Sequence, residues 1–381
     1  MKTFKPTTKS RIEVVDALRG FALLGVLLAN VPFSDDPLVA SAFDGALGFL
    51  SDLLISKKFI TIFSILFGFG FYIQMSRAEK RGVHFKSYFL RRMGLLFLIG
   101  TIHCFVLWNG DIIMSYAFGG AFLLLIRNWS IKKTIVLAVI FNVILTGIVF
   151  IGNSALEWQV YDYDYGLALV QPTTNSYWEY LRVNAIMAPW LNFFKDMPIT
   201  LVYTFGNMLI GVILGKLDFF RLPAKMKNIT NGMILLGFSA GLTSSYFFHL
   251  VMTGEIELDI PMLWVPFVLA AGMIVQSLGY MALFMKLYQN GIFKKMLQWF
   301  KYVGKTALSN YIFQSVFYLF VFFHCTNAFQ LFGNVTKAET YIIGLLFFIL
   351  QSIISHLWLK KHEQGPLEYL WKKWSYKPSQ K

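Results

Sequence analysis

Two side chains of this sequence, His103 and Asp111, are well suited to acid–base chemistry. They lie in the stretch RRMGLLFLIGTIHCFVLWNGDIIMSYA, with Asp111 at a glycine-containing turn between two apolar runs. Histidine exchanges a proton near neutral pH, and a carboxylate can orient its ring and fix its tautomer. We therefore expect His103 to act as a general base that Asp111 orients. The alternative is a histidine that serves helix packing by bonding a backbone carbonyl.

A second set of polar groups repeats one spacing on two apolar segments. Arg19 and Asn30 are 11 residues apart in VVDALRGFALLGVLLAN, and Arg92 and His103 are separated equally. Eleven residues make about three helical turns, so each pair shares one helix face, about 16 Å apart along the axis. We expect these faces to line a common passage in which Asn30 stabilises an oxyanion. For Arg19, the alternative is an ion pair with Asp16 at the membrane interface.

A third polar patch lies near the C-terminus, in VGKTALSNYIFQS. Asn310 and Gln314 are four residues apart and share a helix face, with Tyr311 beside them. Polar side chains often join helices in lipid by hydrogen bonds, which is the simpler interpretation. The alternative is that Asn310, Tyr311 and Gln314 line a substrate site.

The composition indicates the elements that must position these groups. The chain has 381 residues, of which 56% are hydrophobic and only 14% charged. Soluble domains average about 25% charged residues, so we predict an all-α integral membrane protein. The net charge of +14 comes from short basic clusters between apolar runs, which is typical of a membrane protein rather than a nucleic-acid binder. Cys104 and Cys325 are too few for a disulfide framework, and no metal-binding motif is present.

The apolar runs predict a single membrane domain over residues 1–381. Each span needs about 20 mostly apolar residues. We expect about ten transmembrane helices, centred on 15–31, 59–76, 92–108, 112–127, 133–152, 198–215, 230–252, 262–285, 306–326 and 340–359. The first run is long and lacks a clear cleavage site, so it is predicted to be a retained span rather than a signal peptide.

The distribution of Lys and Arg predicts the orientation of the chain. Of the 34 Lys and Arg residues, 28 fall in segments that are cytoplasmic when the N-terminus is inside, and five fall in external segments. Positive charge favours the cytoplasmic side, so both termini are predicted to be cytoplasmic. The external amphipathic segments are then about 34–57 and 153–197, and the cytoplasmic tail is 360–381. The segment 153–197 has room for one or two helices lying across the outer face.

Several stretches resemble the bacterial multi-pass YeiB family over almost the whole chain. They are DALRGFALLGVLLAN, KKFITIFSILFGFGF, the His103 stretch quoted above, VGKTALSNYIFQS and HEQGPLEYLWKKWSY. The resemblance implies a location in the bacterial plasma membrane. It leaves the activity open.

The chain is also distantly similar to transmembrane acyltransferases, namely heparan-alpha-glucosaminide N-acetyltransferase and bacterial envelope O-acyltransferases. The first enzyme opens with D-x-x-R-G followed by an Asn, which here are Asp16, Arg19, Gly20 and Asn30. Both families have a late span of pattern G-x-x-x-x-x-x-Y-x-x-H. Gly304 and Tyr311 match it, whereas Gln314 stands in place of the histidine.

One departure from these families concerns the catalytic histidine. In the N-acetyltransferase it follows the Asn by 11 residues, where this chain has Ser41, and no histidine occurs in 31–83. His103 would therefore supply the base from a different span.

The resemblance and the polar groups together predict an acyltransferase-like bundle that uses acyl-CoA. Cytoplasmic acyl-CoA is polyanionic, and Arg19, Arg91, Arg92 and Lys305 are the expected contacts for its phosphates. His103 would deprotonate a small-molecule, lipid or glycan acceptor that enters from the outer side or from the bilayer. Asp111 would orient the ring and Asn30 would stabilise the oxyanion.

Two other functions fit the same residues. A transporter or exporter of a lipidic or amphipathic molecule would use the Arg, Asn and His face as a substrate or proton pathway. A binding or scaffold protein would have a packed interior with no passage between Arg19 and His103. The sequence is compatible with a homodimer and does not identify the acceptor.

Overall fold

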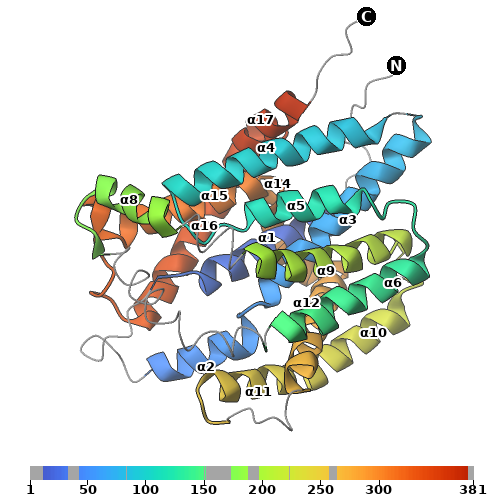
Figure 1. Cartoon of the computed structure of the whole chain (residues 1–381), viewed down its shortest axis with the longest axis horizontal. Coiled ribbons are helices and arrows are strands. Elements are labelled where there is room, and N and C mark those ends of the chain that lie inside the picture. Colours follow the sequence, from blue (N-terminus) through green and yellow to red (C-terminus); the bar gives the residue numbers. More distant parts are fainter. Residues whose placement is uncertain are drawn as a thin grey trace, which may run out of the picture.

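The computed structural model describes residues 12–32, 43–82, 84–149, 151, 173–187, 197–222, 224–256 and 264–375. These residues form helices joined by short turns, and none of them is in a β-strand (Figure 1). The main helices are α1 (Glu13–Ala29), α2 (Asp44–Leu54), α3 (Lys58–Lys80), α4 (Phe85–Val106), α5 (Ile113–Leu123), α6 (Ile131–Val139), α8 (Tyr177–Met187), α9 (Met197–Lys216), α10 (Lys227–Leu236), α11 (Leu242–Met252), α12 (Val265–Gln289), α13 (Gly291–Leu297), α14 (Phe300–Lys305), α15 (Ala307–Val321), α16 (Lys337–Lys361) and α17 (Pro366–Ser375).

Seven helical segments among the described residues are long and apolar enough to cross a membrane. They are Asp44–Lys80, Phe85–Val106, Ile131–Val149, Pro198–Lys216, Lys227–Val251, Val265–Gln289 and Lys337–Lys361. Each overlaps one of the apolar runs that the sequence predicts to be spans. The other three predicted runs form the shorter helices α1, α5 and α15, with 17, 11 and 15 residues. The described part of the chain is therefore all-helical, and its long apolar helices indicate a multi-pass membrane protein.

Two of these long segments change their helical pitch partway along. Residues Ile140–Leu145 follow α6 as a π-helical segment, and Gly237–Gly241 form a second one between α10 and α11. In a π-helix each N–H bonds five residues back, so the face that the helix presents shifts at that point.

Glycines set the closest helix contacts of the core. Gly20 of α1 faces Gly304 of α14, and a Cβ at Gly20 would lie 1.9 Å from the carbonyl oxygen of Phe300. A Cβ at Gly304 would lie 1.8 Å from the carbonyl oxygen of Asp16. Small residues allow helix backbones to approach this closely in a membrane. The glycine of the D-x-x-R-G stretch is thus required by packing.

The stretch FGFGF supplies a second such crossing, between α3 and α9. A Cβ at Gly68 would lie 2.0 Å from the carbonyl oxygen of Met208, and one at Gly211 would lie 1.9 Å from that of Ile65. Helices α3 and α9 are side by side at the centre of the bundle, next to α1 (Figure 1). This trio forms an inner layer against which α5, α6, α12 and α14 pack directly.

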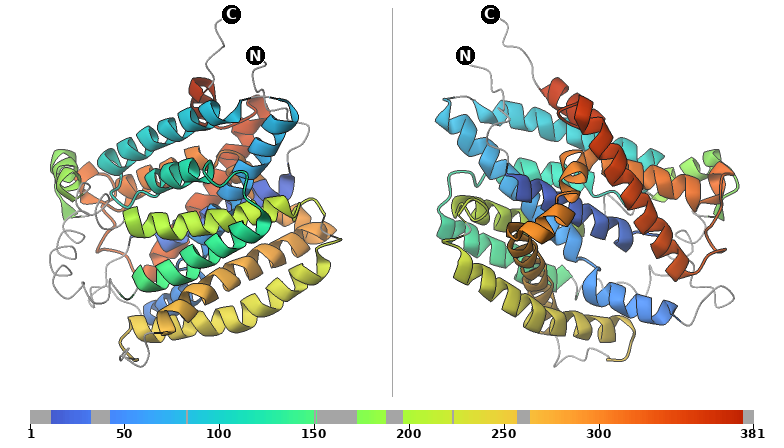
Figure 2. Two further views of the ribbon diagram at one scale, coloured as in Figure 1. Left: turned by 45° about the vertical axis from the view of Figure 1, so that its right-hand side comes forward. Right: turned by 180° about the vertical axis from the view of Figure 1, so that it is seen from behind.

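The remaining helices flank this inner layer on two sides. Figures 1 and 2 show α4 and α17 along one edge, and α10 and α11 along the opposite edge, packed on α12. Helix α16 crosses behind α1 and α14. The two helices that carry the candidate site, α4 and α15, therefore belong to the same side of the bundle as α17.

Three helices lie at the ends of the long ones. Helix α8 covers the C-terminal end of α4: Tyr177, Tyr180 and Asn184 donate hydrogen bonds to the carbonyls of Val106, Leu107 and Phe105. A helix leaves its last carbonyls without internal partners, so these side chains complete the end of α4.

Within the predicted external segments 34–57 and 153–197, the described helices are α2 and α8. Residues 34–42, 153–172 and 188–196 lie outside the described residues. Helix α17 occupies the tail, of which 376–381 also lie outside them.

Candidate functional site

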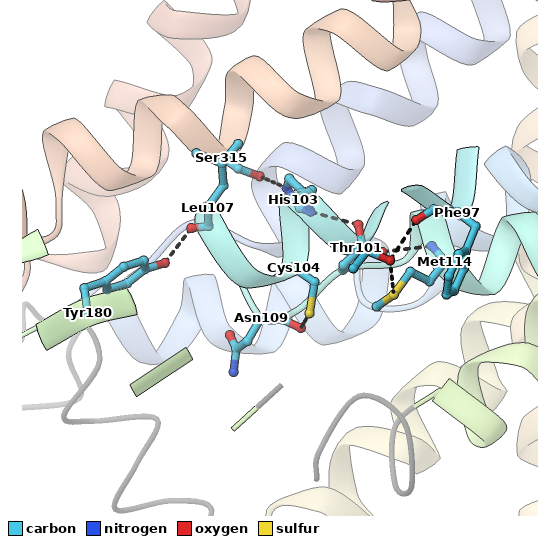
Figure 3. Close-up of polar contacts among 10 residues, drawn as sticks. Phe97, Thr101, His103, Cys104, Leu107, Asn109, Met114, Tyr180 and Ser315 are labelled. Atoms are coloured by element: carbon cyan, nitrogen blue, oxygen red, sulfur yellow. Dashed lines mark hydrogen bonds and ion pairs between the residues drawn. The ribbon is translucent and has the colours of Figure 1, made fainter. Parts of the chain in front are cut away.

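His103 lies at the centre of a line of three hydrogen-bonded side chains. Its Nδ1 is 2.8 Å from Oδ1 of Asp111, and its Nε2 is 2.7 Å from Oγ of Ser315 (Figure 3). All three side chains are buried. The sequence predicted the first contact, and α15 brings the third residue from 212 positions away.

The local sequence explains how Asp111 reaches this position. Its Oδ2 accepts a hydrogen bond of 2.8 Å from the backbone N–H of Met114, in the first turn of α5. A carboxylate is favourable there because the first N–H groups of a helix lack internal partners. Gly100 of α4 makes the approach possible, since a Cβ at this position would lie 2.8 Å from the Met114 nitrogen. Helix α5 is thus held against α4 with Asp111 facing His103.

The bonds of Asp111 determine the chemistry of the histidine. For a neutral ring beside an ionised Asp111, the ring proton lies on Nδ1, which donates a hydrogen bond to Oδ1 of Asp111. Nε2 is then the acceptor, and the Ser315 hydroxyl donates to it. A histidine in this tautomer with a hydroxyl at Nε2 is arranged to remove the hydroxyl proton.

Tyr311 lies one helical turn before Ser315, beside the same histidine. The centres of the Tyr311 and His103 rings are 5.2 Å apart. The Tyr311 side chain is buried, and among the described residues its hydroxyl makes no hydrogen bond of ordinary geometry, although the backbone of Ile112 is close. Buried polar groups are normally hydrogen-bonded, so this hydroxyl is a donor available to the oxygen of a bound molecule.

Asn310 and Gln314, the other two polar residues of this patch, are hydrogen-bonded to neighbouring helices. Nδ2 of Asn310 lies 2.7 Å from Oγ1 of Thr306 and 2.9 Å from Oγ of Ser355 on α16. Nε2 of Gln314 lies 3.2 Å from Oε1 of Gln351, whose own amide donates to the Asn310 carbonyl. These amides fasten α15 to α16, whereas Tyr311 and Ser315 face His103.

Asn30 lies apart from His103. Gln314 and Tyr318 of α15 donate to the carbonyls of Leu23 and Leu27 of α1, so the two helices run parallel in a constant register. Asn30 follows the last residue of α1, about 10 Å beyond the level of Leu23 by the helical rise. It makes no hydrogen bond to His103, and its predicted oxyanion role has no support in this geometry.

The four predicted basic contacts gather at the end of the bundle where α17 lies. Arg91 is exposed and Lys305, at the end of α14, is half-buried. Arg19 forms an ion pair of 2.9 Å with Asp16, with its side chain 27% exposed. Arg92 donates to the hydroxyl of Tyr88, and its guanidinium stacks on Trp371. His103 lies 11 residues from Arg92 on α4, about 16 Å deeper along the helix.

Helix α17 connects the two helices of the site at this basic end. Glu368 accepts hydrogen bonds from the backbone N–H groups of Leu308 and Ser309 and from the Ser309 hydroxyl, which are in the first turn of α15. Trp371, one turn later, donates its indole N–H to the Arg92 carbonyl of α4, at 2.7 Å. Burial raises the pKa of the Glu368 carboxyl, and these hydrogen bonds oppose the rise. The tail therefore fixes α4 relative to α15.

Comparison with known proteins finds a family model that matches part of the chain and similar proteins that match nearly all of it. Residues 214–378 match the family model described as "Protein of unknown function (DUF418)". This region includes α15 and α17, with Tyr311, Ser315 and Glu368, and leaves out His103 and Asp111.

The similarity to individual proteins covers nearly the full chain. The chain is 28% identical to the uncharacterised protein YxaH of Bacillus subtilis (strain 168), over 99% of this chain and 97% of the relative. It is 28% identical to an uncharacterised 39.9 kDa protein in the amylase 3' region of Bacillus acidopullulyticus, over 96% and 94%. It is 24% identical to the uncharacterised protein YeiB of Escherichia coli (strain K12), over 95% of each chain. These similarities support the YeiB family.

Ser315 is the site residue that sequence reasoning missed. It lies in the quoted stretch VGKTALSNYIFQS, four residues after Tyr311, so helical spacing alone would have placed both on one face. Nothing in the sequence indicates that this face meets His103. Among the described residues, no group of three or more His, Cys, Asp and Glu side chains is arranged to hold a metal ion.

Proposed function

We propose that this protein is a membrane acyltransferase that moves an acyl group from cytoplasmic acyl-CoA to an acceptor at the outer side of the membrane. The observation that supports it best is the Asp111–His103 pair with a hydroxyl 2.7 Å from Nε2. This is the arrangement of a base that activates an oxygen nucleophile for acyl transfer.

The basic end of the bundle is the proposed cytoplasmic side and donor site. Arg91 is exposed and Lys305 is half-buried at this end, where Arg92 and Arg19 also lie. Arginine and lysine bind phosphate groups well. The pantetheine arm of CoA is long enough to carry a thioester from this end to the depth of His103, about 16 Å along α4.

In the proposed reaction, the carbon–sulfur bond of the thioester breaks and an ester or amide bond to the acceptor forms. His103 acts as the base, and over the whole reaction the acceptor loses one proton and the CoA sulfur gains one, so no proton is gained or lost overall. Asp111 stabilises the imidazolium that forms in between. The hydroxyl of Tyr311, which has no hydrogen-bond acceptor, would bind an oxygen of the reacting acyl group.

The test compares purified wild-type protein with His103→Ala in lipid nanodiscs, using labelled acetyl-CoA and a long-chain acyl-CoA. CoA release and label transfer to lipid or added glycan are followed by mass spectrometry. Loss of a general base typically costs about 100- to 10,000-fold in rate, and we expect a loss in that range. His84→Ala is the control, because His84 is an exposed residue preceding the same helix. Equal rates for His103→Ala and wild type would remove His103 from the mechanism.

A transporter of a lipidic or amphipathic molecule is the second candidate, and the π-helical segments favour it. In the first of them, Asn142 is buried with neither amide atom hydrogen-bonded among the described residues. Interrupted helices with polar groups are typical of transporter sites. Transport of an unmodified substrate by proteoliposomes without acyl-CoA, unaffected by His103→Ala, would favour this function over acyl transfer.

A further inference from the structure

Ser315 uses its hydroxyl differently from most helical Ser and Thr residues in this protein. Thr61, Thr101 and Thr306 each donate to the carbonyl four residues earlier, which is the usual bond of such residues in a helix. Ser315 makes no such bond and contacts Nε2 of His103 at 2.7 Å. The hydroxyl is therefore committed to the histidine.

The hydrogen bonds around His103 give this contact a direction. Asp111 accepts from Nδ1 with Oδ1 and from the Met114 N–H with Oδ2. In the neutral ring with its proton on Nδ1, Nε2 has a free lone pair, and the Ser315 hydroxyl donates to it. A serine that donates to the free nitrogen of a carboxylate-bound histidine is activated as a nucleophile.

Resting on the acyl transfer proposed above, we propose that Ser315 is the nucleophile and carries the acyl group as a covalent ester between the two half-reactions. In the first half, Ser315 Oγ attacks the thioester carbonyl carbon while His103 takes the hydroxyl proton. The carbon–sulfur bond then breaks, and His103 returns that proton to the CoA sulfur.

The second half-reaction uses the same base. The acceptor hydroxyl or amine loses its proton to His103 and attacks the carbonyl carbon of the seryl ester. The bond from this carbon to Ser315 Oγ breaks, and Oγ takes the proton back from His103. No oxidant, reductant or metal ion is needed, and the enzyme returns to its starting state.

A covalent intermediate suits the position of the site within the bundle. The basic end where CoA would bind and the end of α4 that α8 covers lie on opposite sides of His103, and Tyr180 of α8 donates to the carbonyl of Leu107, four residues after His103 (Figure 3). An acyl group held on Ser315 lets the CoA leave at one end before the acceptor arrives from the other. The two substrates then do not have to be bound beside His103 at the same time.

The experiment combines two reagents on the full-length protein in detergent or nanodiscs. Labelled acyl-CoA is added without acceptor, the reaction is stopped with acid, and the peptide that contains Ser315 is analysed by mass spectrometry. In parallel, an alkyl fluorophosphonate labels activated serines without any need for CoA. The variants are Ser315→Ala, His103→Ala and, as control, Ser277→Ala, a buried serine that donates to the Met273 and Lys58 carbonyls.

We expect acyl and phosphonate adducts on Ser315 of the wild type and of Ser277→Ala. No adduct should form with Ser315→Ala, and labelling should be about 100-fold slower or more with His103→Ala. Size-exclusion profiles equal to that of the wild type would show that the variants are folded. Adducts on Ser315 together with acyl transfer would support both proposals.

The remaining outcomes separate the two proposals. Acyl transfer by Ser315→Ala at the wild-type rate, with no adduct on Ser315 of the wild type, would overturn the assignment of Ser315 as the nucleophile. The proposal of an acyltransferase would be unaffected. A phosphonate adduct on Ser315 without turnover of acyl-CoA would support the nucleophile and overturn the proposed donor. Absence of any adduct in wild type would overturn the nucleophile, and Ser315 would then be a hydrogen-bonding contact between α4 and α15.

Discussion

The guanidinium of Arg92 lies on the face of the Trp371 ring, with its central carbon 3.6 Å from the ring centre. The indole N–H of Trp371 returns a hydrogen bond to the carbonyl of Arg92. Arg92 is therefore part of the contact between α4 and α17 and is less available to a phosphate than its exposed neighbour Arg91. Arg92 is therefore a structural residue, whereas Arg91 remains a candidate for binding the acyl donor.

The first prediction concerns donor binding at this end. Arg91→Gln and Lys305→Gln should each raise the KM for acyl-CoA by about 10-fold, because a hydrogen bond to a charged group contributes about 1.5–3 kcal/mol at most. The KM for the matching acyl-pantetheine, which lacks the nucleotide, should not change. KM values are measured by steady-state kinetics. An equal rise in the KM for acyl-CoA and in that for acyl-pantetheine would show that these residues do not bind the nucleotide.

The second prediction concerns the orientation of His103. In Asp111→Asn, the amide oxygen can keep the bond to the Met114 N–H while its NH₂ group faces Nδ1. The ring proton must then move to Nε2, which can no longer accept from Ser315. We expect a fall in kcat of about 100- to 10,000-fold with little change in the unfolding temperature. Asp218→Asn, on an exposed pair with Arg221, is the control.

The third prediction separates stability from activity at Tyr311. Its buried hydroxyl makes no hydrogen bond of ordinary geometry among the described residues, although the Ile112 backbone is close, and an unsatisfied buried group costs about 1–3 kcal/mol. Tyr311→Phe should therefore raise the unfolding temperature in a detergent melt while it lowers the rate of acyl transfer. A lower unfolding temperature would mean that the hydroxyl makes a stabilising bond instead.

The sequence predicts the helical membrane fold well because lipid imposes strong requirements on composition. Long apolar runs predicted the seven segments that can span a membrane, and the basic end and the His103–Asp111 pair followed from local spacing. The sequence did not predict that α1, α5 and α15 are shorter than the seven long segments. Where these helices end depends on their packing against neighbouring helices, which local patterns do not show.

Local sequence patterns did not predict the contacts between segments that are distant in the chain. Ser315 is an ordinary residue by type, and its importance comes from the crossing of α4 and α15. Lys58 is one of the five basic residues that the sequence places in external segments, yet it begins α3 and is fully buried, with its ammonium group donating to the Asp52 carbonyl. A charge count cannot detect a backbone carbonyl that makes such burial possible.

The fourth prediction concerns the crossing of α1 and α14. Gly20→Ala and Gly304→Ala each place a methyl group within 2 Å of a backbone oxygen, and neither helix backbone can yield without moving the other. Overpacking typically costs about 1–3 kcal/mol, so both variants should unfold at lower temperature than wild type.

Gly94→Ala is the matched control for this crossing, because a Cβ there meets nothing within 4 Å. It should be neutral or stabilise the protein by up to about 1 kcal/mol through helix propensity. Thermal unfolding of all three variants under the same conditions would check this, and equal stability of Gly94→Ala and Gly20→Ala would contradict the close approach.

The last prediction concerns the pH dependence of α17 docking through Glu368. Burial raises the pKa of this carboxyl above its ordinary value, which is about 4.3 in an exposed glutamate. Between the ordinary and the raised pKa, docked Glu368 holds a proton that the undocked side chain has lost. Docking is therefore strongest below the ordinary pKa and weakens as the pH rises through the raised value.

Hydrogen exchange of residues 366–375, corrected for the intrinsic effect of pH, measures this docking directly. In wild type, protection should decrease as the pH rises from the ordinary pKa to the raised pKa of Glu368, and it should be constant above that. Glu368→Gln, which cannot ionise, should remove the decrease. Glu363→Gln, an exposed residue of the same tail, should retain it. A decrease that persists in Glu368→Gln would assign the pH dependence to another group and leave Glu368 as a hydrogen-bond acceptor for the first turn of α15.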